Sequence, residues 1–252
     1  MRFAALDAAP PNARISRMTS RVFSVPLLLA IALSAQTKVD ITAEPHHHLT
    51  LENKYVRVFD VIVPPGQSTL LHVHSHDYVY VAIGPSEITN QVEGKPVTQT
   101  KLQDGQTQAV DGGFTHVVRT VSPTPFRNIT VELLQDAEAR KSPPPRWGPN
   151  GEDERGLQVL DGGTKDIMFV KDGVRVSEID LRPGGMIPKH HHAGPHMIVA
   201  ITDLTLSTDV PGKEVSTIQL RAGEYKWFPG DFTHTLMNIG KQQAKFIGLE
   251  FH

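Results

Sequence analysis

The chain has 252 residues, no cysteine and a formal net charge of −2 at pH 7. This charge, without any stripe of lysine and arginine, argues against a nucleic-acid partner. The absence of cysteine excludes disulfide bonds. With 39% hydrophobic and 21% charged residues, the composition is that of an ordinary globular protein. The length allows two domains of roughly 100 residues each.

Residues Met18 to Gln36 have the pattern of a secretory signal peptide. Arg21 supplies the positive flank, Val22 to Leu33 the apolar run, and the small residues up to Ala35 a cleavage site. The apolar run is too short for a bilayer, which needs about 20 residues. We therefore expect an exported protein, periplasmic or secreted, with no membrane partner after signal removal. A membrane anchor or a buried N-terminal helix is the alternative.

Two β-rich segments follow. The stretch from Tyr55 to Val63 is rich in β-branched and aromatic residues and stops at Pro64-Pro65-Gly66, which predicts a strand and a turn. Short strand-like stretches continue to Leu134 without a sustained helical period. A charged, proline-rich stretch from Asp136 to Gly156 is typical of a semi-rigid spacer. Strand-like sequence resumes at Ile167.

The sequence thus predicts an all-β protein with two tandem domains. We place an N-terminal extension with the signal peptide at 1–35 and the first domain at 36–135. The linker takes 136–163 and the second domain 164–252.

The two β-rich segments are copies of one another at a constant offset. His72, His74 and His116 each lie 118 positions before His190, His192 and His234. Val56-Arg57-Val58 recurs as Val174-Arg175-Val176 at the same offset. A long internal period of this kind indicates a duplicated domain. The copies can pack as a pseudo-dimer, and a homo-oligomer is a further expectation.

Each copy carries a His-x-His pair and a distant third histidine, which is a metal-site pattern. Residues two apart in a strand point the same way, so His190 and His192 can bind one ion while His191 faces away. His196 has the same parity, and His234 arrives from a separate strand. Nitrogen donors favour Mn, Fe, Ni, Cu or Zn over Mg or Ca as the divalent cofactor.

These motifs resemble those of the cupin family, whose first motif is a glycine, a His-x-His pair and a glutamate. Its second motif holds a glycine, a proline, a histidine and an asparagine. The C-terminal copy matches with GGMIPKHHHAGPH, where His196 replaces the glutamate, and with GEYKWFPGDFTHTLMN. The N-terminal copy matches with GQSTLLHVHSHDY and GQTQAVDGGFTHVVRT. It has Tyr78 in place of the glutamate, Asp111 in place of the proline and Thr120 in place of the asparagine.

The resemblance implies a bicupin, with two tandem jelly-roll barrels joined by the proline-rich linker and a metal in the barrel mouth. The implied ligands of the second barrel are His190, His192, His196 and His234. Those of the first are His72, His74 and His116, because Tyr78, with an ordinary pKa of about 10, is a poor ligand. This first site has open positions, recruits His76 or Asp77, or is empty. We interpret His46 to His48 as a solvated loop.

The first interpretation of function is a metalloenzyme of dioxygenase type that acts on a small oxygenated or enolisable molecule. The alternatives are a non-enzymatic bicupin that binds a metal or small molecule, and a non-redox lyase or isomerase. The sequence identifies no catalytic residue. Because the departures from the motifs lie in the first copy, we expect altered or lost activity there.

Overall fold

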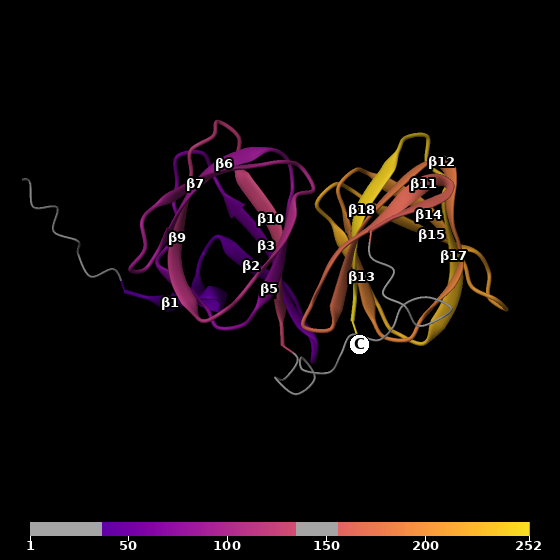
Figure 1. Cartoon of the computed structure of the whole chain (residues 1–252), viewed down its shortest axis with the longest axis horizontal. Coiled ribbons are helices and arrows are strands. Elements are labelled where there is room, and N and C mark those ends of the chain that lie inside the picture. The colour runs from indigo at the N-terminus through magenta and orange to yellow at the C-terminus, as the bar shows by residue number, and fades with distance from the viewer. Residues whose placement is uncertain (1–36, 135–155, 252) are drawn as a thin grey trace, which may run out of the picture. The chain divides into compact units, whose positions relative to one another are not determined.

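The computed structural model describes residues 37–134 and 156–251 (Figure 1). The predicted signal peptide and most of the predicted linker lie outside these residues. The described chain is built of strands and one short 3-10 helix, η1 (Ile41–Ala43), which confirms the all-β prediction. Within this part of the chain, no helix has the length and apolar character to cross a membrane.

The N-terminal copy forms two five-stranded sheets whose strands alternate along the chain, as in a jelly roll. One sheet contains, in order, β1 (Val39–Asp40), β4 (His72–His74), β9 (Phe114–Thr120), β6 (Ser86–Val92) and β7 (Thr98–Leu102). The other contains β2 (His47–Glu52), β3 (Val56–Val63), β10 (Phe126–Leu133), β5 (Tyr78–Ala82) and β8 (Thr107–Val110).

Both sheets contribute buried side chains to the interior of the first barrel. Phe59 and Val61 of β3 pack with Ile88 of β6 and Val118 of β9 in one buried cluster. Strand alternation sends Val56 and Val58 to the opposite face of β3. There they join a second buried cluster that also contains Val174 and Val176, their counterparts in the other copy, so both faces of this sheet are covered.

The C-terminal copy forms one continuous sheet. Its order is β15 (Ser216–Leu220), β14 (Leu204–Asp209), β17 (Phe232–Asn238), β12 (Val174–His192), β18 (Ala244–Glu250), β13 (His196–Ala200) and β16 (Tyr225–Phe228), with β11 (Gly156–Lys171) beside β12. β12 is long enough to join both halves of the barrel: residues 175–181 pair with β18 and residues 186–192 pair with β17.

The duplication is visible strand by strand. β5 begins at Tyr78 and β13 at His196, and β9 begins at Phe114 and β17 at Phe232, which preserves the offset of 118. β11 begins at Gly156, so residues 156–163 belong to a strand although the sequence places them in the linker. The remaining domain boundaries stay predictions.

Candidate metal centres

The C-terminal copy brings three predicted ligands together in the barrel. His190 on β12 and His234 on β17 lie opposite each other in the ladder, and His192 follows two residues along β12. The three Nε2 atoms form a nearly equilateral triangle: 3.0 Å from His190 to His192, 3.2 Å from His192 to His234 and 3.1 Å from His234 to His190. His192 and His234 are buried, whereas His191 is exposed and points away, as predicted.

The protonation of these rings fits a cation at the centre of the triangle. The Nδ1 of His190 lies 2.8 Å from the carbonyl oxygen of Pro188, which only accepts, so this nitrogen carries the proton and Nε2 presents a lone pair. The Nδ1 of His234 is occupied by the Thr208 hydroxyl at 2.7 Å. Two nitrogen atoms that each lie about 2.1 Å from an ion, with an angle of about 90° at the ion, are about 3.0 Å apart. The triad therefore fits a divalent transition metal.

Burial keeps the rings neutral, which is the form that binds metal. It lowers the pKa of His192 to about 2 and that of His234 to about 3, with a smaller contribution from the neighbouring histidines. The same desolvation lowers the pKa of His190.

A buried ion pair lies behind this triad. The Oε1 atom of Glu250 is 4.0 Å from Nδ1 of His192, and its Oε2 accepts a hydrogen bond from the Arg175 guanidinium at 2.9 Å. Lys165 lies 3.5 Å from Oε1. Burial opposes ionisation of Glu250, but the two cations outweigh it and lower the pKa of this carboxyl to about 2.

His196, the fourth predicted ligand, lies beside the triad. Its ring stacks on His192 with centroids 3.8 Å apart and on Phe228 with centroids 4.6 Å apart. It is buried, and within the described chain its Nδ1 has no hydrogen-bond partner. The group of nitrogen atoms within 4.8 Å of one another contains His190, His192 and His234. A ligand role for His196 stays a prediction.

The N-terminal copy also brings its three predicted ligands close together. His72 on β4 lies opposite His116 on β9, with 3.0 Å between their Nε2 atoms, and the Nε2 of His74 lies 3.2 Å from that of His72. The Nδ1 of His72 bonds the carbonyl oxygen of Leu70 at 2.9 Å, and that of His116 bonds Asn90 at 2.9 Å. Burial lowers the pKa of His72 to about 4 and that of His116 to about 3.

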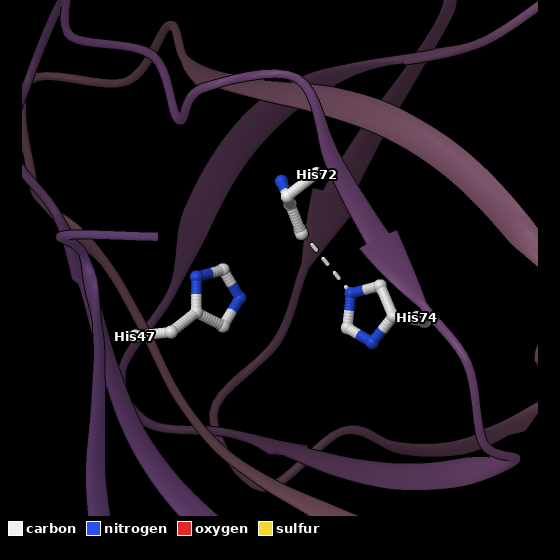
Figure 2. A group of neighbouring side chains, drawn as sticks. All are labelled: His47, His72 and His74. Carbon is white, nitrogen blue, oxygen red and sulfur yellow. Dashed lines mark hydrogen bonds between the residues drawn. The ribbon is translucent and has the colours of Figure 1, made fainter. Parts of the chain in front are cut away.

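His47 joins this cluster, and the interpretation of His46 to His48 as a solvated loop is wrong for this residue. His47 is the first residue of β2, where it pairs with Val61 of β3, and it is only 8% exposed. Its ring centroid lies 4.7 Å from that of His72. Nitrogen atoms of His47, His72 and His74 lie within 4.8 Å of one another, and Figure 2 shows the three side chains gathered in one place.

Two residues of the first copy that could have completed its ligand set are directed elsewhere. The Oδ1 of Asp77 accepts the N–H of Gly112 at 2.7 Å, and its Oδ2 pairs with Lys171 at 3.0 Å. Tyr78 stacks on His74 with centroids 4.2 Å apart, and burial raises the pKa of its phenol above the ordinary value. A protonated phenol is a weak metal ligand, so Tyr78 does not take over the role of the glutamate.

A cavity of about 180 Å³ opens inside the first barrel against its histidines. His47, His74 and His116 line one part of it. The other lining residues come from both sheets and are neutral or apolar, such as Asn90 and Phe126; none of them is a lysine or an arginine. The structure thus offers an internal space for a small ligand beside nitrogen donors.

The fold and its histidine clusters define a class of protein: the chain has the two-barrel cupin fold, as the motifs predict. Solved structures with this architecture include the oxalate decarboxylase of Lactobacillus farciminis, with a TM-score of 0.57 and 13% identity over 81% of this chain and 84% of that one. The oxalate decarboxylase of Bacillus subtilis matches with a TM-score of 0.56 and 15% identity over 78% of this chain and 68% of that one.

One curated relative is a germin-like protein of Morus alba. It is 32% identical over 77 residues, which is 30% of this chain and 37% of that protein. No protein-family model matches the sequence. At these levels of identity and coverage, the comparisons establish the fold.

Proposed function

We propose that this chain is a metalloenzyme that carries out a lyase or isomerase reaction on a small carboxylate or enolisable molecule in its N-terminal barrel. The observation that carries the proposal is the internal cavity of about 180 Å³ that opens directly onto His47, His74 and His116. A divalent ion held there would supply positive charge to a carboxylate or enolate oxygen.

The lining of the cavity supports a small ligand that depends on such an ion. Its volume lies below the roughly 300–1,000 Å³ of pockets that hold drug-sized molecules. Because no lysine or arginine lines the cavity, no side chain there neutralises an anionic ligand. The imidazole ligands are neutral as well, so the full charge of the ion is available to the ligand.

The comparisons favour the non-redox alternative over the dioxygenase interpretation. Solved structures that are similar to this chain include oxalate decarboxylases, and one of these was studied for the Mn(II) centres of the Bacillus subtilis enzyme. We therefore propose Mn(II) as the first metal to test among Mn, Fe, Ni, Cu and Zn.

The test is turnover by the metal-loaded protein. We expect elemental analysis to find a transition metal, and the Mn(II)-loaded protein to convert oxalate or another two- to four-carbon carboxylate without stoichiometric oxygen uptake. Turnover is measured by product formation, and oxygen uptake is measured in the same reaction with an oxygen electrode. Oxygen uptake that matches turnover would restore the dioxygenase interpretation. Bound metal without turnover of any substrate would favour the non-enzymatic alternative.

Export through the signal peptide remains a proposal, as does the restriction of partners to a small molecule and copies of this chain. We expect cell fractionation to find the protein in the periplasm or the medium. We expect N-terminal sequencing to place the mature N-terminus near Ala35.

A further inference from the structure

We propose that His47, oriented by Glu44, is the fourth metal ligand of the N-terminal barrel and takes the role that position 78 has in the cupin motif. This inference rests on the proposed metal-binding function. It concerns a residue outside both cupin motifs, on a strand that the sequence comparison does not connect with metal.

The position of His47 is the first argument. β2 pairs with β3, and the pairing of His47 with Val61 turns its side chain into the barrel, where Val61 is part of the buried interior. The ring lies within 4.7 Å of His72 and 6.0 Å of His74, measured between centroids. One nitrogen atom of His47 thus lies within 4.8 Å of a nitrogen atom of each member of the His-x-His pair.

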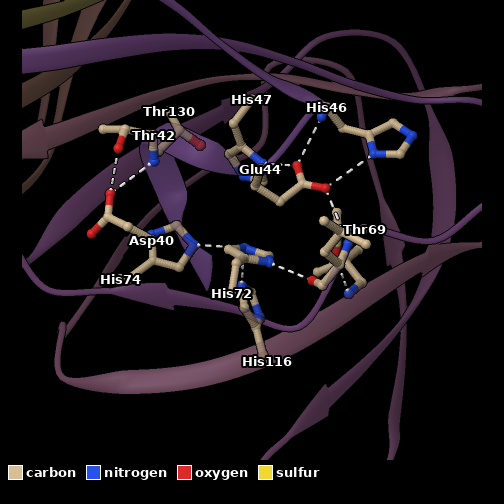
Figure 3. A network of polar contacts seen from close by, with 12 residues as sticks. Asp40, Thr42, Glu44, His46, His47, Thr69, His72, His74, His116 and Thr130 are labelled. Carbon is tan, nitrogen blue, oxygen red and sulfur yellow. Dashed lines mark hydrogen bonds and ion pairs between the residues drawn. The ribbon is translucent and has the colours of Figure 1, made fainter. Parts of the chain in front are cut away.

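Glu44 gives the second argument, because it sets the tautomer of His47. The Glu44 carboxylate accepts the backbone N–H of His46 at 2.9 Å and of Leu70 at 3.0 Å, so it is held as an acceptor. Its Oε2 lies 2.5 Å from Nδ1 of His47, which must therefore donate (Figure 3). Nε2 is left with its lone pair toward the other histidines. A carboxylate behind a histidine in this way is a recurrent feature of metal centres.

Comparison of the two copies gives the third argument. At the offset of 118, Lys165 occupies the position of His47 and Gly162 that of Glu44, while His196 occupies the position of Tyr78. Each copy thus has one extra histidine next to its triad, supplied by β2 in one case and β13 in the other. The orienting carboxylate is present where the histidine is on β2 and absent where it is not. Histidine and carboxylate are thus present together in one copy and absent together at the same positions of the other, as a ligand and its support would be.

The test isolates the N-terminal site. In a His192→Ala background, which removes a ligand of the C-terminal site, we compare His47→Ala, Glu44→Gln and the control His48→Ala. His48 neighbours His47 on β2, but it is exposed. The probe is Mn(II) alone, titrated with detection of the free ion by electron paramagnetic resonance. Pulsed resonance counts the coordinated imidazole nitrogens, and circular dichroism with the melting temperature checks folding.

We expect His47→Ala to weaken Mn(II) binding at least about 10-fold and to remove one coordinated imidazole, and Glu44→Gln to weaken it about 10- to 100-fold. His48→Ala should leave both readouts unchanged. The inference is overturned if folded His47→Ala binds Mn(II) within about twofold of His48→Ala, with the same number of imidazoles. If His47→Ala does not fold, unchanged affinity in Glu44→Gln overturns it.

The parent proteins separate this inference from the proposed function. If the wild-type protein binds no transition metal, the proposed function and the inference both fail. If the wild type binds one ion and His192→Ala removes it, the N-terminal barrel binds no metal, and the proposed N-terminal reaction site fails together with the inference. If His192→Ala keeps an ion and folded His47→Ala binds Mn(II) as tightly as His48→Ala does, the inference alone fails.

Discussion

At the scale of single residues, the two candidate metal centres differ in the charge around a buried glutamate. Glu132 and Glu250 occupy equivalent positions, as do Arg57 and Arg175. Glu250 has two cations, Lys165 and Arg175, and ionises readily. Glu132 is fully buried with Arg57 at 3.5 Å, and its Oε1 has no hydrogen-bond partner within the described chain. His47 stands where the second copy has Lys165, so Glu132 lacks the second cation that Glu250 has.

This difference predicts a pH dependence of stability in the metal-free protein. Burial raises the pKa of Glu132 from 4.5 to about 7, although Arg57 opposes the shift. The folded state therefore binds the proton more tightly than the unfolded state, and this contribution to stability, complete below about pH 4.5, is lost as the pH rises to about 7. We expect Glu132→Gln to raise the free energy of unfolding by roughly 1–3 kcal/mol at about pH 8 and to change it little at about pH 5.

Urea denaturation at the two pH values measures this difference, and Glu250→Gln is the matched control. Because the pKa of Glu250 is lowered to about 2, its ionised form stabilises the fold at both pH values, and its loss should be destabilising at both. Equal effects of Glu132→Gln at the lower and the higher pH would contradict the prediction.

At the scale of elements, strand alternation and ladder register together build each centre. The alternation of side chains predicts from the sequence that His190 and His192 share a face. The alignment of His190 with His234, and of His72 with His116, depends on which strands are neighbours, and periodicity does not contain that information. His47 was missed for the same reason. Its place in the barrel follows from the pairing of β2 with β3, and the second copy gives no hint because Lys165 stands there.

Close contact between two turns holds these strands in register. A Cβ atom added to Gly112, in the β8–β9 turn, would lie 2.4 Å from the carbonyl carbon of His76, in the β4–β5 loop. A Cβ atom added to Gly230, the counterpart of Gly112, would lie 2.5 Å from the carbonyl carbon of Gly194. In each copy this contact joins the strand of the third histidine to the loop that follows the His-x-His pair.

Gly112→Ala should therefore destabilise the first barrel. The methyl group would meet backbone, which cannot move aside without shifting the loop, and overpacking of this kind costs roughly 1–3 kcal/mol. Gly248→Ala is the control, because the nearest atom there is the flexible Cδ1 of Ile179 at 3.3 Å. Unfolding midpoints in urea compare the two variants. A smaller loss for Gly112→Ala than for Gly248→Ala would show that the turn contact does not constrain the barrel.

At the scale of the whole molecule, duplication made the fold predictable, and divergence between the copies made the sites hard to predict. The constant offset between the histidines predicts two barrels, and the strands of the second copy keep this offset. From the motif departures at Tyr78, Asp111 and Thr120, the sequence predicts altered or lost activity in the first copy. The structure nevertheless has a cavity beside the histidines of that copy. Motif comparison considers only motif positions, whereas His47 and part of the cavity lining, such as Asn90 and Phe126, lie outside the motifs.

The proposed reaction site in the N-terminal barrel predicts different effects on turnover for two equivalent substitutions. His116→Ala and His234→Ala each remove the third histidine of one copy, so each should lower the Mn(II) content by about one ion per chain. Because the cavity is lined by His116, turnover should be lost in His116→Ala and kept in His234→Ala. Formate, a small carboxylate, serves as a probe that does not depend on turnover. Its addition should change the Mn(II) resonance spectrum of His234→Ala, whose remaining ion lies beside the cavity, and leave that of His116→Ala unchanged. The reverse pattern would place the reaction in the C-terminal barrel, where His196 and Lys165 would then be the residues to examine first.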